Sequence, residues 1–144
     1  MPTDPLDEHI QAGINIQVSS SILLNFVSVI LKPYKLTFQQ YNVLRILNDD
    51  APNPVSVKKI SSKMIDRNSN ASRLVDKLVE KKFALRNASP VDKRITHISI
   101  TEKGHDLVSA ANLDLESKFI QRTSLISKDE AKMLNALLEK LINS

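Results

Sequence analysis

The sequence predicts a mainly α-helical fold with a small β-hairpin wing, flanked by long N- and C-terminal helices. Three observations lead to this fold class. Aromatic residues make up only 4% of the 144 residues and glycine occurs only twice, which disfavours turn-rich β-sandwiches and barrels. Apolar residues recur at helical spacing along most of the chain. One segment, Arg94 to Ile100, instead places alternate residues on opposite faces, as a strand does.

The N-terminal segment is expected to form one long helix, from Leu6 to about Leu31. Its apolar side chains are spaced mostly by four residues: Leu6, Ile10, Ile14, Val18, Ile22 and Phe26. Pro33 is expected to stop the helix, because proline has no N–H and disfavours a helical conformation in the residue before it.

Capping residues predict the next two helices. Thr37-x-x-Gln40 is a capping box that opens a helix whose buried stripe includes Tyr41, Leu44 and Leu47. Residues 49–54, which contain two prolines, predict a loop. Ser56 can then cap a short third helix with Val57, Ile60 and Met64 among its apolar positions.

A fourth helix is expected from about Ser69 to Lys82. Its apolar face follows the i, i+3, i+4, i+7 pattern: Ala71, Leu74, Val75 and Leu78. The opposite face begins with small polar residues and Arg73 and becomes acidic only toward its C-terminal end, at Asp76 and Glu80. This asymmetry suits a helix whose N-terminal half meets an anion.

A two-stranded hairpin follows, with Phe83–Asn87 as one strand, a turn over 88–93 and Arg94–Ile100 as the second strand. A fifth helix begins at Thr101, and the capping box Ser127-x-x-Glu130 opens a sixth with a strong apolar stripe. Three helices followed by a two-stranded wing are a winged helix-turn-helix pattern. The expected parts are an N-terminal dimerisation helix (1–36), the winged helix-turn-helix (37–101) and C-terminal dimerisation helices (102–144).

The net charge of +4 is unevenly distributed. Residues 58–103 contain twelve basic and five acidic side chains, a net charge of +7, whereas the remainder has a net charge of −3. A basic middle between acidic flanks favours contact between the middle and a polyanion. On charge alone, a solvated helix surface is an equally good interpretation.

Several protein classes are excluded by composition. The absence of cysteine excludes disulfides, thiolate zinc sites, iron–sulfur clusters and thiol redox switches. The N-terminus carries Asp4, Asp7 and Glu8, the wrong charge for a signal peptide. Val18–Leu31 is judged too short and too polar to span a bilayer, so a soluble cytoplasmic protein with no membrane partner is expected.

Four segments together resemble the MarR family of bacterial transcription regulators. They are Leu36–Leu44 (Leu-Thr-Phe-Gln-Gln-Tyr-Asn-Val-Leu), Asn70–Leu78 (Asn-Ala-Ser-Arg-Leu-Val-Asp-Lys-Leu), Ser89–Arg94 (Ser-Pro-Val-Asp-Lys-Arg) and Ile98–Gly104 (Ile-Ser-Ile-Thr-Glu-Lys-Gly). The resemblance implies a winged helix-turn-helix that binds double-stranded DNA as a homodimer. Two family glycines are absent: Lys82 follows the fourth helix, and Ile65-Asp66 occupies the region between the third and fourth helices. Lys82 must therefore adopt a strained conformation or end the helix differently.

The fourth helix then becomes the expected recognition helix in the major groove. Small or hydrogen-bonding residues allow close approach to base edges, and a long donor reaches guanine O6 and N7. The expected DNA-binding residues on this helix are Ser69, Asn70, Ser72, Arg73 and Lys77, with Lys77 better placed for a phosphate. Helix capping is an equally good explanation of Ser69 and Asn70.

The resemblance also assigns roles to the wing. It implies that Arg94 enters the minor groove, where narrow A·T-rich DNA concentrates negative potential, and that Asp92 orients this arginine. Lys93 is expected to contact the DNA backbone. Lys58, Lys59 and Lys63 are expected to supply an electrostatic background rather than sequence recognition.

The first, fifth and sixth helices carry apolar stripes that a winged helix does not need for its own core. The terminal stripe resembles the family's dimerisation region, although an intramolecular bundle is the alternative. In many relatives a small, often phenolic or lipophilic anion releases the DNA; here the lack of cysteine leaves a small-molecule effector or none.

Two other functions are weighed. No catalytic constellation, glycine-rich phosphate loop or cofactor motif is apparent, so an enzyme is not expected; a zinc or sensory site at His97 and His105 is a minor alternative. The second is a winged-helix protein-interaction module that does not bind DNA.

Overall fold

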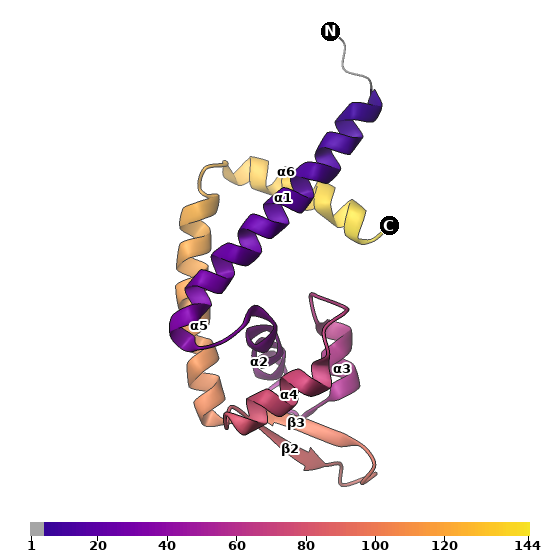
Figure 1. Ribbon diagram of the computed structural model, residues 1–144, viewed down its shortest axis with the longest axis vertical. Helices are drawn as coiled ribbons and strands as arrows, with labels where there is room; N and C mark the ends of the chain where they lie inside the picture. The colour runs from indigo at the N-terminus through magenta and orange to yellow at the C-terminus, as the bar shows by residue number, and fades with distance from the viewer. Residues whose placement is uncertain (1–4) are drawn as a thin grey trace. The chain divides into compact units, whose positions relative to one another are not determined.

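The computed structural model describes residues 5–144 (Figure 1). The N-terminal acidic residue Asp4, used above against a signal peptide, lies outside the described residues, as does the side chain of Leu6. The elements are α1 (Pro5–Leu31), a 3-10 turn η1 (Lys32–Tyr34), α2 (Phe38–Asp50), β1 (Val55–Ser56), α3 (Val57–Lys63), α4 (Ala71–Glu80), β2 (Ala84–Ala88), β3 (Thr96–Ile100), α5 (Glu102–Thr123) and α6 (Lys128–Ile142). The mainly helical fold class with a small β-wing is confirmed.

Helix α1 ends where proline predicts. Its last residue is Leu31, and Pro33 lies inside the tight turn η1 that follows. The C-terminal end of the helix is buried, through Val27, Ile30 and Leu31, whereas many apolar side chains nearer its start are exposed.

Val18–Leu31, expected from its length and polarity not to span a bilayer, is part of a longer apolar helix. Residues 7–34 form a helical stretch that is long and apolar enough to span one, with a mean hydropathy of 1.7 in its best window. Val18–Leu31 is only the densest apolar run of this helix, which carries no charged residue between His9 and Lys32. Length and composition alone do not separate a membrane span from an exposed apolar face that binds another protein.

Local capping chemistry sets the starts of α2 and α3. Thr37 Oγ1 accepts a hydrogen bond from Gln40 N at 3.1 Å, and Gln40 Oε1 accepts one from Thr37 N at 3.2 Å, which completes the capping box. Ser56 Oγ accepts from Lys59 N at 3.1 Å and opens α3. Both predicted caps are confirmed.

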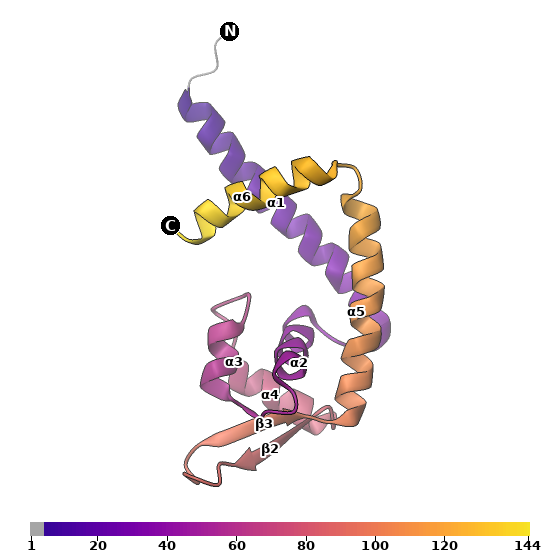
Figure 2. The same ribbon diagram turned by 180° about the vertical axis from the view of Figure 1, so that it is seen from behind.

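The sheet has three strands rather than the predicted two. In the order β1-β3-β2, both neighbouring pairs are antiparallel, and β1 joins through Val55 opposite Ile98 and Ser56 opposite His97. No strand is predictable before α3, because two residues show no periodicity of their own and are held in place only by pairing with the distant strand β3. Figure 2 shows the hairpin of β2 and β3 below α4 from the reverse side.

Lys82 occupies the position at which the MarR family, which the sequence resembles, usually has glycine, and it adopts the left-handed conformation with φ of 65°. Phe83 N donates to Leu78 O and Lys82 N donates to Val79 O, both at 2.9 Å. These two bonds form a complete Schellman motif, so the usual helix end is kept. The lysine therefore accepts the strain rather than ending the helix differently.

The core of the winged helix lies between α2, α3, α4 and the sheet. Its fully buried side chains include Leu44, Leu47, Ile60, Leu78 and Ile98. Gly104, in the first turn of α5, lies so close to this unit that a Cβ would overlap the carbonyl oxygen of Phe83. Glycine is required there by close approach, not by an unusual φ.

The chain divides into two compact units, one up to Asn112 and the other from Leu113 to Ser144. The first contains α1, the winged helix and the start of α5; the second contains the rest of α5 and α6. Ser127 and Glu130 form the predicted capping box of α6, with bonds of 3.2 and 2.7 Å. The predicted boundaries at 36/37 and 101/102 separate dimerisation from DNA binding, and this division by role stays a prediction.

Candidate nucleic-acid interface

Helix α4 has one buried face and one solvent face. Ala71, Val75 and Leu78 are buried in the core, which fixes the rotation of the helix about its axis. The other side is exposed at Ser72, Arg73, Asp76 and Lys77. The sequence predicts these four positions to face outward, and it predicts the same of Ser69 and Glu80.

The start of α4 corrects the sequence analysis. The helix begins at Ala71, because Asn70 Oδ1 accepts a hydrogen bond from Arg73 N at 3.1 Å and makes Asn70 the N-cap. Ser69 therefore precedes the helix rather than lying on its outward face. Its Oγ is buried and has no hydrogen-bond partner among the residues that the structure describes. Capping by Asn70 leaves its Nδ2 as a donor at the rim of the helix.

Two clefts lie beside α4. The first, of about 600 Å³, separates it from α3 and includes Ser61, Arg67, Ser69 and Ser72 in its lining. The second, of about 460 Å³, separates it from the start of α2 and includes Gln39, Arg73 and Lys77. The proposed groove-reading residues thus line two hollows on one side of the winged helix.

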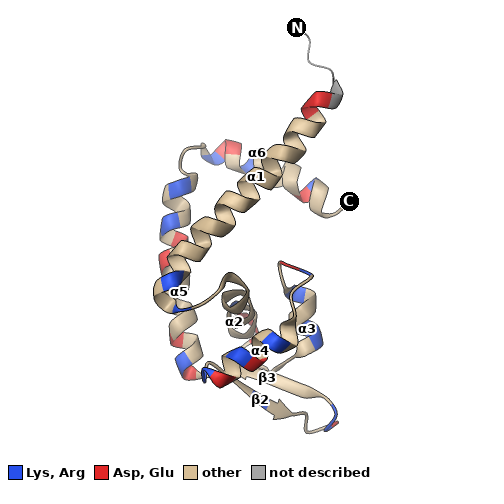
Figure 3. Cartoon of the chain, in the orientation of Figure 1, with Lys and Arg blue, Asp and Glu red and all other residues tan. Residues whose placement is uncertain are grey.

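The cations around α4 differ in their ion pairs. Lys77 Nζ lies 3.6 Å from Glu80 Oε2, and Arg86 of β2 pairs with Asp76 Oδ1 at 2.5 Å. Arg73 has no ion pair within the described part of the chain. Figure 3 shows that Lys and Arg gather on α3 and α4, whereas α1 is almost entirely without charge.

The wing tip is organised by Asp92. Its Oδ1 accepts hydrogen bonds from Arg94 N at 3.0 Å and Arg94 Nε at 3.2 Å, while the Arg94 side chain remains 92% exposed. The bond from the Arg94 backbone, then the one from its side chain, lowers the pKa of the Asp92 carboxyl, so it is ionised at neutral pH. Ser89 Oγ, inside the turn, accepts from Val91 N at 3.3 Å. Lys93 is exposed beside this bracket.

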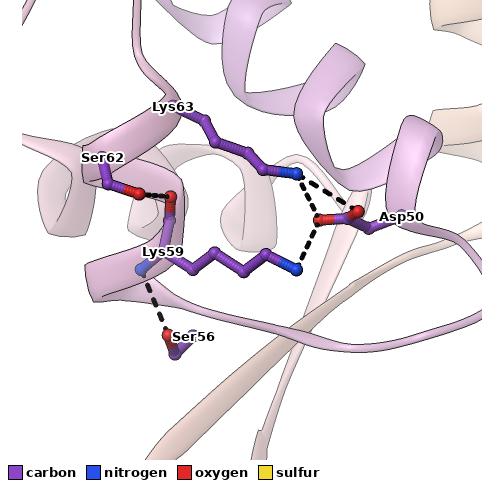
Figure 4. Close-up of polar contacts among 5 residues, drawn as sticks. All are labelled: Asp50, Ser56, Lys59, Ser62 and Lys63. Carbon is purple, nitrogen blue, oxygen red and sulfur yellow. Dashed lines mark hydrogen bonds and ion pairs between the residues drawn. The ribbon is translucent and has the colours of Figure 1, made fainter.

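The three lysines of α3 are not equivalent, although the sequence analysis grouped them. Lys63 Nζ lies 3.0 Å and Lys59 Nζ 3.3 Å from Asp50 Oδ2 at the end of α2 (Figure 4). Hydrogen bonds from Lys63 and Lys59 lower the pKa of Asp50. Lys58 points elsewhere, into the cleft beside α4. Only Lys58 is left as an unpaired cation of this helix among the described residues.

His97 and His105 have different neighbours. His105 Nδ1 lies 2.6 Å from Asn48 Oδ1, and His97 lies on β3 opposite Asn87. Within residues 5–144 no group of three or more His, Cys, Asp or Glu side chains is placed to hold a metal ion. Asn48 therefore accounts for the polar contact of His105 without a ligand.

Sequence reasoning missed several features of this surface. Arg67 and Ser61 were not selected, because they lie on a turn and a short helix that come next to Ser72 only in the folded chain. The ion pairs of Asp50 could have been suspected from its place at the end of α2, but only tertiary structure shows which lysines it takes.

A family model for the transcriptional regulator SarA/Rot matches residues 25–111. The HTH-type transcriptional regulator MgrA of Staphylococcus aureus is 33% identical over 115 residues, covering 80% of this chain and 76% of MgrA.

Among solved structures, Sco5413, a MarR family transcriptional regulator from Streptomyces coelicolor, is 27% identical with a TM-score of 0.81, over 93% of this chain and 92% of that one. The S. aureus MepR–DNA complex shares the fold, with a TM-score of 0.83 at 21% identity over 91% and 96% of the two chains. The chain therefore belongs to the SarA/Rot family of transcriptional regulators, which have the MarR-type winged-helix fold.

Proposed function

We propose that this regulator represses transcription by binding a palindromic site on duplex DNA as a homodimer. The observation that carries the proposal is that two elements of one segment of net charge +7 each present an exposed arginine: Arg73 on α4 and Arg94 on the wing. The relatives support it, because MgrA is an HTH-type regulator and MepR is a fold neighbour in complex with DNA.

In this proposal α4 enters the major groove. Ser72 and Arg73 read base edges, with the guanidinium of Arg73 suited to guanine O6 and N7. Asn70 contributes Nδ2 as a hydrogen-bond donor to the DNA. Ser69 contributes to the same surface, because it lines both clefts beside α4. Lys77 contacts a phosphate. Its ion pair with Glu80 is weak, because both side chains are more than half exposed, so the lysine can exchange the carboxylate for the phosphate.

The wing enters the adjacent minor groove. Asp92 accepts hydrogen bonds from the backbone N, the Nε and, at 3.4 Å, the Nη2 of Arg94, and this bracket orients the arginine side chain, which is 92% exposed, toward the groove. Lys93 contacts the DNA backbone. Substitution of Asp92 is therefore expected to act through Arg94 rather than by direct contact.

Self-association is supported by apolar faces that the chain leaves exposed. On α1 these include Ile10, Ile14 and Val18, each about half exposed, and on α6 Leu137 and Leu141. Contiguous apolar surface of this kind marks an interface rather than a solvent face. We infer that it pairs two copies of the chain rather than entering a bilayer, and that the protein is cytoplasmic and not an enzyme. A small-molecule effector that releases DNA is part of the proposal, as the resemblance implies for many relatives.

Alanine substitution tests the reading residues. Arg94→Ala is expected to weaken binding to promoter DNA strongly, and Arg73→Ala to weaken it by about 1–3 kcal/mol while relaxing base preference. Lys128→Ala, which removes the same charge from α6, serves as the control. Binding is measured on the native promoter duplex and on a panel of single-base variants.

Equal affinity of wild type, Arg73→Ala and Arg94→Ala for the promoter would refute this assignment of residues. A winged-helix interaction module that does not use DNA is the alternative, and it would show no binding to the promoter at low salt.

A further inference from the structure

The cleft between α3 and α4 has the composition of an anion site. Its lining combines two basic side chains, four serines and an asparagine with two small apolar residues: Val57, Lys58, Ser61, Ser62, Arg67, Ser69, Asn70, Ala71 and Ser72. None of these described residues is acidic. The neighbouring cleft beside α2, in contrast, includes Asp66.

The two cations of the cleft are available to a ligand. Lys58 and Arg67 are exposed, and within the described residues neither forms an ion pair. The lysines next to Lys58 in sequence are in a different state, because Lys59 and Lys63 share the carboxylate of Asp50. Figure 4 shows both ammonium groups directed at that carboxylate. One short helix therefore carries one unpaired and two paired cations.

The hydroxyl groups add donors at the same place. Within residues 5–144 the buried Oγ of Ser69 has no hydrogen-bond partner, whereas a buried hydroxyl normally has one. Ser61 and Ser72 line the cleft from the two helices that flank it. Two guanidinium or ammonium groups together with hydroxyl donors suit a group with several anionic oxygens, such as a phosphodiester.

We propose that this cleft seats one backbone phosphate of bound duplex DNA, held by Lys58 and Arg67, and that Asp50 keeps Lys59 and Lys63 out of DNA binding. The proposal rests on the DNA binding proposed above and deepens it. It adds two contact residues, and it divides the lysines of α3 into one that binds DNA and two that brace α3 against α2. Because a phosphate carries no base identity, the seat fixes the register of α4 in the groove rather than the sequence read.

Salt dependence separates a phosphate contact from other effects. Each phosphate contact contributes about 0.9 to the slope of log K against log salt on duplex DNA. Lys58→Ala and Arg67→Ala are each expected to make that slope less negative by about 0.9. Each should lose about threefold more affinity at 50 mM salt than at 200 mM, on promoter and unrelated duplexes alike.

Lys59→Ala and Lys63→Ala are the matched controls, since they remove the same charge from the same helix. Both are expected to keep the wild-type slope. An unchanged slope in Lys58→Ala and Arg67→Ala, or an equal loss in all four variants, would overturn the proposed seat. All variants are compared at equal helical content by circular dichroism, so that a folding defect is recognised as such.

Binding of the wild-type protein to duplex DNA distinguishes a failure of the proposed function from a failure of the phosphate seat alone. If it binds no duplex at low salt, the proposed function fails. If it binds with a steep salt dependence that Lys58→Ala and Arg67→Ala leave untouched, DNA binding stands and the phosphate seat is wrong.

Discussion

Single residues decide which charges of this surface are available to a partner. Asp50 occupies Lys59 and Lys63, whereas Lys58, Arg67 and Arg73 have no ion pair among the described residues. Exposed pairs of this kind contribute little to stability, so their main effect is on where positive charge is presented. The local arrangement of carboxylates therefore shapes the interface more than the net charge does.

Lys82 is a residue at which stability can be gained. A non-glycine residue at φ of 65° has its Cβ too close to the following carbonyl oxygen, at a cost of about 1–2 kcal/mol. Lys82→Gly relieves this contact but increases the entropy of the unfolded chain, so we expect a net gain of about 0.5–1 kcal/mol in the free energy of unfolding. Urea denaturation followed by circular dichroism measures it.

Lys82→Ala is the control for that substitution. It removes the same charged side chain but keeps a Cβ, so its free energy of unfolding should stay close to that of wild type. A loss of stability in Lys82→Gly would show that the lysine side chain, and not the backbone strain, dominates at this position.

At the scale of elements, α4 is anchored at both ends. Asn70 caps its start, and at its end Lys81 Nζ donates to Lys35 O at 3.0 Å and to Gln40 Oε1 at 3.5 Å. Gln40 Oε1 also accepts from Thr37 N in the capping box of α2. Lys81 therefore ties the C-terminal end of the recognition helix to the turn between α1 and α2, which positions α4 without contact to the proposed DNA surface.

Lys81→Met tests this tie, because it keeps the length of the side chain and removes its donors. We expect affinity for the promoter to fall several-fold while the salt slope stays that of wild type. Lys81→Arg, which keeps a charged donor, should recover much of the affinity. A slope less negative by about 0.9 in Lys81→Met would instead identify Lys81 as a phosphate contact.

The sequence predicts those elements whose signals are local. The caps at Thr37, Ser56 and Ser127 were found because acceptor and amide lie three residues apart. The start of α4 was misplaced by two residues, since Ser69 and Asn70 are both good N-caps and only the structure shows which side chain is used. Strand β1 was missed because its pairing with β3 is a long-range contact.

The candidate site divides in the same way. Arg73, Asp92 and Arg94 are predicted from sequence motifs; in the structure Arg73 and Arg94 are exposed on α4 and the wing, and Asp92 is partly buried in the wing turn. The sequence does not predict the place of Arg67 or the ion pair between Lys59 and Asp50, because both depend on how α2, α3 and α4 pack. Local motifs thus predict the elements of the candidate interface, and tertiary contacts determine which of its cations have ion pairs.

Net positive charge and exposed apolar stripes lie on different elements of the described chain. The basic segment is the winged helix, whereas α1 and α6 expose apolar side chains and α1 carries hardly any charge (Figure 3). Two copies joined through such faces would present two recognition helices about 34–36 Å apart, one turn of duplex DNA. Self-association and DNA binding are therefore coupled in this account.

Leu137→Lys tests that coupling. Leu137 is 53% exposed on the apolar stripe of α6, and a buried lysine there would disfavour an interface. We expect wild type to have about twice the 16.1 kDa mass of the chain by light scattering at micromolar concentration, and the variant to shift toward one chain mass. Asn135→Lys, which adds the same charge outside the stripe, should remain dimeric. A monomeric wild type would contradict the proposed homodimer.

The central claim is that the winged helix binds duplex DNA. The most direct measurement is the affinity of the wild-type protein for its own promoter duplex across a series of salt concentrations. We predict binding at low salt whose logarithm falls steeply and linearly with the logarithm of salt concentration, because phosphate contacts release counterions. Absence of binding at low salt, or an affinity that salt leaves unchanged, would contradict the central claim.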